Sequence, residues 1–267
     1  MYVVGVDIGS SSSKAVALEE SGRVVAKAVV DLGTGTTGAE AVMGLLRSRL
    51  SENAGPCAFI TATGYGRRTF PGARSQKSEL SCHARGVHAL FPSVRTVIDI
   101  GGQDSKVMRL TESGSLEQFL MNDKCAAGTG RFLEMMSRVL DLDLRKFGSV
   151  DLKAQKILPI SSTCSVFAES EVISLLSQGK PVEEILAGIH QSVASKVGAL
   201  VRNIGILPDV AVTGGVAQNS GVVRALERLL HCTLLVPDEP QLTGAIGAAL
   251  FALEEWRRET DPKDGCI

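Results

Sequence analysis

One stretch of this sequence occurs twice. Residues 4–18 read VGVDIGSSSSKAVAL and residues 97–110 read VIDIGGQDSKVMRL, and their turns align with a constant offset of 92 residues. Each copy has a β-branched run, an Asp-Ile-Gly turn and a second apolar run, then a polar turn and a third run. The aligned pairs are Asp7 with Asp99, Gly9 with Gly101, Ser13 with Ser105 and Lys14 with Lys106. We therefore expect a duplicated α/β fold, with two related domains around a nucleotide cleft.

The remaining elements are predicted from hydrophobic periodicity and from Gly and Pro breakers. We expect helices over 39–50, 83–90, 131–139, 167–177, 182–203, 222–230 and 243–256. Further strands are expected over 59–62, 157–161, 210–213 and 234–236. The first domain would then hold residues 1–95 and the last helix, 243–256, and the second residues 96–242. The polar tail, 257–267, is expected to be frayed.

Composition excludes several classes of function. The chain has 267 residues, 44% of them hydrophobic, and a net charge of −1, which gives no support for a nucleic-acid or anionic-membrane partner. The first residues lack the features of a signal peptide, and no apolar run approaches the ~20 residues that span a bilayer. We expect a cytoplasmic protein, in which the six cysteines are core residues, reactive thiols or metal ligands rather than disulfides.

The two copies of the repeat have the composition of phosphate-binding turns. In the first phosphate turn (residues 7–14), Gly9 permits a tight turn, the serines offer hydroxyl and amide donors, and Lys14 adds positive charge. The second phosphate turn covers residues 99–106. Asp7, Asp99 and Asp104 are candidate Mg²⁺ anchors and catalytic groups, with water completing the Mg²⁺ shell. The candidate residues are Asp7, Ser10, Ser11, Ser12, Ser13 and Lys14 in the first turn, and Asp99, Gly101, Gly102, Gln103 and Asp104 in the second.

A third glycine turn lies in VTGGVAQN, residues 212–219, which we call the adenosine loop. A strand that leads into Gly214 and Gly215 and then a helix fits a site where adenosine lies against bare backbone, with Gln218 or Asn219 offering polar contacts. The chain has no Walker GxxxxGK[ST] motif and no Rossmann fingerprint. The order of two phosphate turns, an adenosine loop and a glycine-opened last helix resembles the actin, Hsp70 and sugar-kinase superfamily of ATPases.

Two of the cysteines precede predicted helices. Cys125 lies in NDKCAAGTGRF and Cys164 in SSTCSVFAESE, where a helix N-terminus lowers the pKa of a thiol and suits a thiolate ligand. For Cys57, Cys82 and Cys232 the favoured interpretation is simple burial, although His83 could join Cys82 as a ligand. No CxxC pair occurs, so two cysteines per chain make half of a four-thiolate site. A two-fold dimer would complete a [4Fe–4S] site.

With these motifs, the chain closely resembles the activator proteins of 2-hydroxyacyl-CoA dehydratases and the related ATPase subunits of benzoyl-CoA reductases. The shared motifs run from residue 4 to about residue 256. They include GVDIGS, TGYGR (63–67), SELSCHA (78–84), VIDIGGQD (97–104), MNDKCAAGTGRF (121–132), SSTCSVFAESEVIS (161–174), GIHQSVAS (188–195) and VTGGVAQN. The two motifs that contain Cys125 and Cys164 are the most specific of them.

The resemblance implies a homodimer with one bridging [4Fe–4S] cluster, reduced by ferredoxin or flavodoxin. It implies that ATP binding and hydrolysis, with ATP and ADP as the nucleotides and Mg²⁺ as the cation, drive transfer of one electron to an iron–sulfur dehydratase. Carried over by motif, Cys125 and Cys164 are the cluster ligands. The two phosphate turns with Gly214, Gly215 and Gln218 belong to the nucleotide site, and Gly128 and Gly130 approach the phosphates.

Two other functions fit parts of the sequence. A small-molecule kinase of the same fold could use Asp104 or Asp123 as a base, but it gives the two cysteines no role. A nucleotide-gated scaffold, such as a filament or chaperone module, would also use the repeat. His190 is expected to be a packed core or surface residue rather than a ligand, and Glu169 and Glu171 either contact nucleotide or cap their helix.

Overall fold

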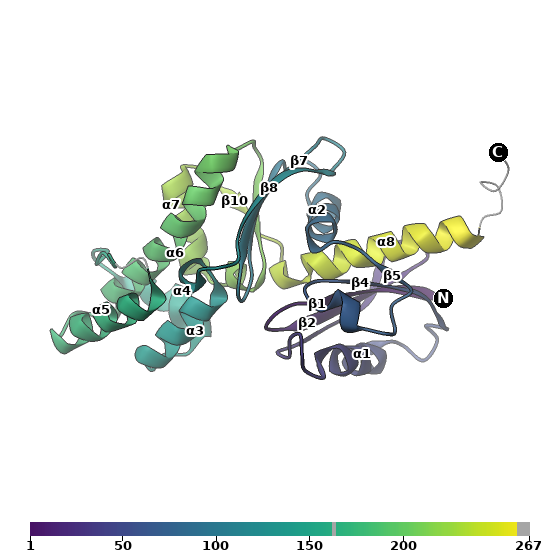
Figure 1. Cartoon of the computed structure of the whole chain (residues 1–267), viewed down its shortest axis with the longest axis horizontal. Coiled ribbons are helices and arrows are strands. Elements are labelled where there is room, and N and C mark those ends of the chain that lie inside the picture. Colours follow the sequence, from purple (N-terminus) through teal and green to yellow (C-terminus); the bar gives the residue numbers. More distant parts are fainter. Residues whose placement is uncertain (162–163, 261–267) are drawn as a thin grey trace. The chain divides into compact units, whose positions relative to one another are not determined.

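The computed structural model of the protein describes residues 1–161 and 164–260 (Figure 1). The chain divides into two compact units. Unit 1 comprises Met1–Pro92, Glu112–Leu116 and the chain from Gln241 onward, and unit 2 comprises Ser93–Thr111 and Glu117–Pro240. Each unit is built on a five-stranded sheet covered by helices, which confirms the expected α/β class.

The sheet of unit 1 has the strand order β3-β2-β1-β4-β5. Its strands are β1 (Tyr2–Ile8), β2 (Ser13–Glu19), β3 (Val24–Val30), β4 (Cys57–Thr63) and β5 (Ser75–Gln76). The first three strands form an antiparallel meander, and β4 runs parallel to β1. The helices of this unit are α1 (Gly38–Arg49), α2 (Glu79–Leu90) and α8 (Thr243–Thr260).

Strand alternation explains why both faces of this sheet are covered. Val4, Val6 and Ile8 of β1 pack in one cluster with Val42, Met43 and Leu46 of α1. The intervening Val3 packs in a second cluster with the alanines of α8. Gly5 has no side chain because the backbone of α8 lies against it: a Cβ there would be 2.1 Å from the Ala249 nitrogen. The small-residue face of α8 therefore lets the helix lie directly on the sheet.

The sheet of unit 2 has the order β10-β9-β6-β7-β8. Its strands are β6 (Thr96–Ile100), β7 (Ser105–Leu110), β8 (Leu116–Asn122), β9 (Val210–Thr213) and β10 (Leu234–Leu235). Strand β6 is antiparallel to β7 and parallel to β9. The helices are α3 (Gly130–Val139), α4 (Phe147–Val150), α5 (Ser165–Ser177), α6 (Val182–Ile204) and α7 (Ser220–Leu230).

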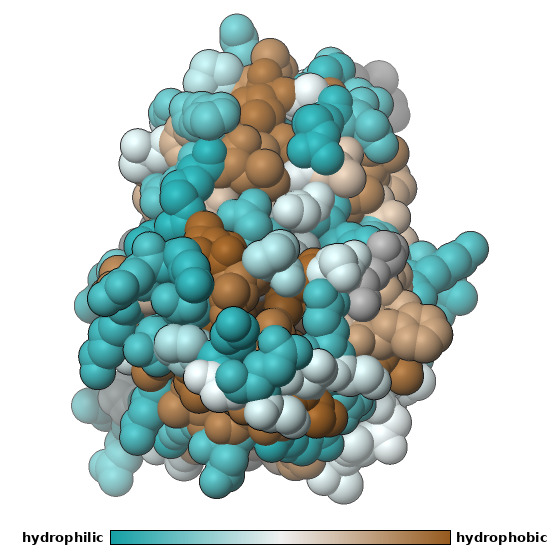
Figure 2. Space-filling view, turned by 90° about the vertical axis from the view of Figure 1, so that its left-hand side faces the viewer, coloured by the Kyte–Doolittle hydropathy of each residue, from teal (hydrophilic) through white to brown (hydrophobic). Residues whose placement is uncertain are grey.

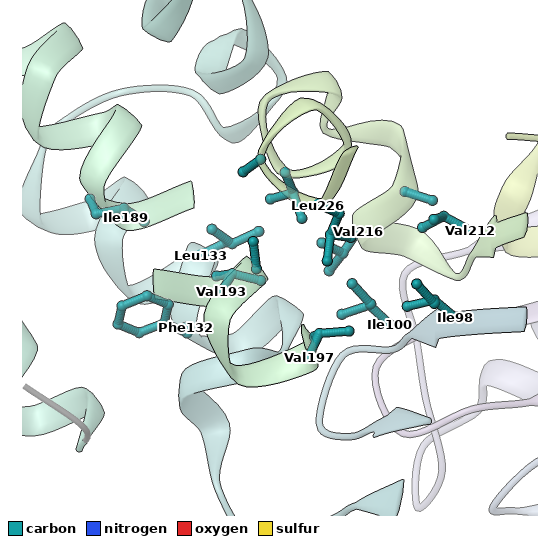
Figure 3. Packing of buried hydrophobic residues seen from close by; sticks show 14 of the residues in the cluster. Ile98, Ile100, Phe132, Leu133, Ile189, Val193, Val197, Val212, Val216 and Leu226 are labelled. Atoms are coloured by element: carbon teal, nitrogen blue, oxygen red, sulfur yellow. The ribbon is translucent and has the colours of Figure 1, made fainter. Parts of the chain in front are cut away.

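The core of unit 2 lies between its sheet and its helices (Figure 3). Ile98 and Ile100 of β6 and Val212 of β9 point toward Val193 and Val197 of α6. Phe132 and Leu133 of α3 and Leu226 of α7 close the same cluster. The core therefore fixes the starts of α3 and α7, and each start follows a glycine loop.

The duplication read from the sequence is reproduced in the strand pairing. In unit 1, Asp7 is paired with Lys14 and Ile8 with Ser13. In unit 2, Asp99 is paired with Lys106 and Ile100 with Ser105, in the same register. The turns also match, because Gly9 N donates to Ser12 O at 3.0 Å and Gly101 N donates to Asp104 O at 2.9 Å. The predicted repeat is therefore one hairpin built twice.

Three details of the predicted elements were wrong. Residues 157–161 form no strand: Leu158 N donates to Glu184 O of α6, and Ser161 N donates to the Glu171 carboxylate, so these donors pair with a helix carbonyl and a side chain. Helix α2 begins at Glu79 rather than at 83, since the Ser78 hydroxyl accepts from Ser81 N as an N-cap.

Helix α8 continues to Thr260, where a frayed tail was expected from 257; Arg257 and Arg258 in its last turn suit a helix C-terminus. The rest of the predicted tail lies outside the described residues. Of the helices that the structure describes, none is long and apolar enough to cross a membrane.

Candidate functional site

The first phosphate turn places a buried carboxylate next to partly exposed serine residues. Asp7 is 3% exposed, and Lys14 Nζ lies 3.6 Å from its Oδ2. The other carboxylate oxygen, Oδ1, is buried and has no hydrogen-bond partner among the described residues; the same holds for the Ser11 hydroxyl. Ser13 is committed elsewhere, since its hydroxyl donates to Leu32 O at 2.7 Å. Asp7 and Ser11 thus retain bonding capacity for a ligand, water or cation.

The second phosphate turn holds a buried lysine between two carboxylates. Lys106 is 2% exposed, with Nζ 2.8 Å from Asp104 Oδ1 and 3.6 Å from Asp99 Oδ2. Asp99 also accepts from the Thr213 hydroxyl at 2.8 Å, which ties β6 to β9 immediately before the adenosine loop. Gly101 and Gly102 remain partly exposed and Gln103 is exposed, so the turn presents backbone to solvent. The exposed backbone of this turn suits an anion nest, and Lys106 offsets the charge of the two carboxylates beside it.

The glycine segment before α3 packs on the second phosphate turn. Gly130 N donates to Gly101 O at 2.9 Å, and Arg131 N donates to Gly102 O at 2.8 Å. A Cβ at residue 130 would lie 3.2 Å from Gly102 Cα, so a side chain would crowd this contact. The first turn of α3 is therefore bonded directly to the predicted phosphate-binding backbone. Gly128 is buried, and a Cβ there would lie 3.1 Å from Lys196 Cβ.

In the adenosine loop, the fold requires glycine at residue 214 but not at residue 215. Gly214 has φ +85°, and a Cβ there would lie 2.3 Å from Ile100 O, so the fold itself requires glycine. Gly215 is exposed, and no atom lies within 4 Å of the place that a Cβ would take, so packing does not require glycine there. Gln218 is also exposed, and Asn219 caps α7 by accepting from Gly221 N at 3.0 Å. The loop therefore offers bare backbone and an amide to a ligand.

Cys125 lies in a structured loop but not at the start of an α-helix. It is half-buried and precedes a single 3₁₀ turn, Ala126–Gly128, while Thr129 occupies the N-cap position of α3. Cys125 was expected in a polar loop before a helix; a 3₁₀ turn follows it directly, and α3 begins only at Gly130. Asn122 holds the loop from both sides: its Oδ1 accepts from Cys125 N at 3.2 Å and its Nδ2 donates to Cys125 O at 2.9 Å.

Cys164 is the N-cap residue of α5, as expected. Its thiol is exposed, and its carbonyl accepts from Ala168 N at 2.9 Å. Glu171, further along the helix, accepts from Ser161 N and from the Ser161 hydroxyl at 3.0–3.1 Å. Glu171 thus binds Ser161, a role that neither alternative from the sequence had included.

The remaining described cysteines have different surroundings. Cys82 is fully buried in α2, and burial raises the pKa of its thiol to about 12, which leaves it protonated and unsuited to ligate a metal. Cys232 is partly buried, and burial raises its pKa as well. Cys57 is exposed, so the expected burial was wrong there: it begins strand β4 beyond the core.

Sequence reasoning missed the side chains that hold these loops in place. Asn122 carries a detectable signal, since an Asn three residues before the cysteine fits an Asx-type turn. Glu171 and His190 carry none, because their partners are distant in sequence or lie in irregular segments. His190 is fully buried and bonds to Asp151 and Asn219, which fits the expected core residue but adds a polar role.

Comparison with known proteins gives consistent results. Residues 4–252 match the model of the BadF/BadG/BcrA/BcrD ATPase family. The chain is 51% identical to the 2-hydroxyisocaproyl-CoA dehydratase activator of Clostridioides difficile, over 96% of each chain. It is 48% identical to the (R)-2-hydroxyglutaryl-CoA dehydratase activating ATPase of Acidaminococcus fermentans, over 96% of this chain and 98% of the relative.

Solved structures agree. The activator of the 2-hydroxyisocaproyl-CoA dehydratase from Clostridium difficile with bound ADPNP superposes with a TM-score of 0.94 at 49% identity, covering 100% of this chain and 98% of that one. A ROK family glucokinase from Streptomyces griseus has a TM-score of 0.59 at 15% identity, over 95% of this chain and all of that one. The second likeness concerns the fold alone and confirms the expected sugar-kinase-like ATPase architecture.

Proposed function

Because this chain belongs to the BadF/BadG/BcrA/BcrD ATPase family, we propose that it is an ATP-dependent one-electron donor that activates a 2-hydroxyacyl-CoA dehydratase. The relatives are ATPases and activators by name, which supports the coarse function directly. The proposal adds a [4Fe–4S] cluster shared by a homodimer, with Cys125 and Cys164 of each chain as its ligands. When bound, this cluster would supply one-electron transfer from ferredoxin or flavodoxin to the dehydratase.

The thiols of unit 2 fit such a group. Cys164 is exposed and caps α5, and Cys125 is half-buried in a loop that Asn122 fixes. Both belong to unit 2, whereas Cys57 and Cys82 belong to unit 1. A [4Fe–4S] cluster takes four cysteine thiolates. Because Cys125 and Cys164 are the two ligands proposed for one chain, the proposed cluster requires a second copy of the chain.

The surface of α5 supports the second copy. Val166, Phe167 and Ile173 are 62%, 69% and 49% exposed on this helix, directly after Cys164. Figure 2, which looks at the side of the molecule where α5 lies, shows apolar side chains gathered between polar ones. Large exposed apolar side chains beside a proposed ligand are typical of an interface. A dimer axis beside α5 would bring two copies of Cys164 close together.

One observation carries the coupling between nucleotide and thiol: the backbone bonds from Gly130 N and Arg131 N to Gly101 O and Gly102 O. A phosphate bound at the second turn would act on carbonyls that are already bonded to the start of α3. Cys125 lies five residues before Gly130 in the same loop. A change of phosphate state could thus reach the Cys125 loop through one layer of hydrogen bonds.

Nucleotide binding would use both phosphate turns and the adenosine loop. In unit 1 the orphaned Asp7 Oδ1, the Ser11 hydroxyl, Ser10 and Ser12 are proposed to face the phosphates and Mg²⁺, mostly through water. In unit 2 the proposed contacts are Gly101 to Asp104, Gly214, Gly215 and Gln218. The domain division into 1–95 with 243–256 and 96–242 remains part of this proposal.

The test is the iron and acid-labile sulfide content of protein purified without oxygen, with a visible spectrum. We expect about four irons per dimer. Cys125→Ala and Cys164→Ala should both lose them. Cys57→Ala is the matched control, because Cys57 is also an exposed thiol but lies in unit 1, and it should keep full iron content.

Iron-free wild-type protein that still hydrolyses ATP would contradict the electron-transfer proposal. That result would favour a small-molecule kinase instead. The comparisons do not favour this alternative, because the relatives of high identity are activators. Equal loss of iron in all three variants would contradict the ligand assignment.

A further inference from the structure

A buried polar network lies behind the adenosine loop. His190 of α6 is fully buried, and its Nδ1 lies 2.8 Å from Asp151 Oδ2. On the other side of the ring, Nε2 lies 3.1 Å from Asn219 Nδ2. Arg224 of α7 forms a short ion pair with the second oxygen of Asp151. One chain of contacts therefore connects α7, the segment Asp151–Lys153, α6 and the last residue of the adenosine loop.

The hydrogen bonds of Asn219 determine which atoms donate and which accept in this network. Its Oδ1 accepts from Gly221 N at 3.0 Å and from Val222 N at 3.4 Å, as the N-cap of α7. The amide nitrogen is then the group that faces His190, so it donates to Nε2. The ring must therefore carry its proton on Nδ1, which donates to Asp151. Asp151 selects the tautomer, and that tautomer in turn holds Asn219.

Steric packing holds the ring in place. A Cβ at residue 221 would lie 2.2 Å from His190 Cε1 and 2.7 Å from Asp151 Oδ2, so glycine at this position makes room for the pair. The Phe147 ring packs against the imidazole with centroids 6.1 Å apart. Arg224 also donates to Gly148 O at 2.6 Å, which fixes the far end of the network. These contacts hold the His190 ring with Nε2 directed at Asn219.

We infer that His190 is a positioning residue for the nucleotide, acting through Asn219 on the adenosine loop. This inference rests on the proposed function, because it assumes that Gly215 and Gln218 contact the nucleotide. Asn219 directly follows Gln218, and its own N–H donates to Val216 O at 2.9 Å, inside the loop. Without the bond to His190, the amide of Asn219 is held only by its N-cap bonds to Gly221 N and Val222 N, so the loop conformation that presents Gly215 and Gln218 is held less firmly.

Two substitutions at residue 190 separate this role from packing. Gln places its side-chain oxygen near the position of Nε2, so His190→Gln keeps an acceptor for Asn219. Asn places its amide near Nδ1, so His190→Asn keeps the bond to Asp151 but leaves Asn219 without its acceptor. We expect His190→Asn to raise the KM for ATP about five- to tenfold with kcat unchanged, as for loss of one hydrogen bond. His190→Gln should stay within about twofold.

Asn219→Ser provides a second route if His190→Asn does not fold. Serine keeps an N-cap for α7 but is too short to reach His190. It should raise the KM for ATP as His190→Asn does, and the double variant should be no worse than either single one. Equal KM values for His190→Asn and His190→Gln, or additive effects in the double variant, would overturn the inference.

A further variant distinguishes an error in the role of His190 from an error in the proposed nucleotide site. Gly215→Val tests directly whether the adenosine loop contacts nucleotide. If it also leaves the KM unchanged, the assignment of the loop is wrong. If it raises the KM while the residue 190 variants do not, the loop assignment stands and the role of His190 is wrong.

Discussion

Gly215 is the residue at which a ligand contact can be tested with little risk to the fold. Nothing lies within 4 Å of a Cβ built there, and the residue is exposed, so Gly215→Val should leave the thermal midpoint nearly unchanged. If adenosine lies against this backbone, the valine should weaken binding of a fluorescent ADP analogue at least tenfold, about 1.4 kcal/mol. Gly44→Val, at an exposed and open position of α1 in unit 1, is the control and should keep full affinity.

Asp151 predicts a pH dependence of stability. Burial alone would raise the pKa of this carboxyl, but the hydrogen bond from His190 and the charge of Arg224 outweigh burial and hold the pKa below its ordinary value. A carboxyl with a lowered pKa in the folded state contributes stability that is fully present above its unfolded pKa of about 4. That stability is lost as pH falls through the folded pKa.

The free energy of unfolding, measured with urea, should therefore fall below about pH 4. Asp151→Asn should be less stable than wild type at pH 7, and its stability should change less between pH 4 and lower values. Parallel pH profiles for the two proteins would show that this carboxyl does not contribute.

At the scale of elements, helix α8 packs against helix α2 through a glycine. A Cβ at Gly247 would lie 1.8 Å from Cys82 O of α2, and a backbone atom cannot move aside cheaply. Gly247→Ala should cost at least about 2 kcal/mol of unfolding free energy, as overpacking does. Gly44, inside α1, has open space, so Gly44→Ala should instead stabilise the protein by about 0.5–1 kcal/mol. Chemical denaturation of the two variants checks both signs.

The hairpin repeat was predictable because its turn chemistry is local: Asp, Gly and Lys recur at one spacing. A second correspondence between the two units could not be predicted from the sequence. Thr63 and Thr213 pair with Asp7 and Asp99 in the adjacent parallel strands, and each is followed by a glycine with φ near +85°, Gly64 and Gly214. The sequence context around the two glycines differs, and only the strand register reveals their equivalence.

The missed features share one physical cause. Glu171 bonds to Ser161 across ten residues, and His190 meets Asp151 and Asn219 from different elements. Such contacts are set by tertiary packing and leave no periodic pattern. The segment 157–161 was misread as a strand for the same reason, since it packs on α6 instead of joining a sheet: a Cβ at Gly188 would lie 1.8 Å from Leu158 O.

At the scale of the whole molecule, the proposed cluster requires two chains, so the oligomeric state and the iron content should change together. Phe167 is 69% exposed on α5, three residues after Cys164. A carboxylate at this position would be buried without a partner in a dimer, which is costly, whereas it would be fully solvated in a monomer. Phe167→Glu should therefore favour the monomer while all its cysteines remain.

The measurement is sedimentation velocity together with iron per chain, both without oxygen. Phe167→Glu should sediment as a monomer and lose most of its iron, because each chain then offers only the two proposed ligands, Cys125 and Cys164. Phe119→Glu is the matched control, since Phe119 is 45% exposed on strand β8 of the unit 2 sheet and should leave mass and iron unchanged. A monomeric variant with full iron content would mean that one chain binds the metal alone, and a dimer without iron would mean that α5 contributes to the metal site but not to the interface.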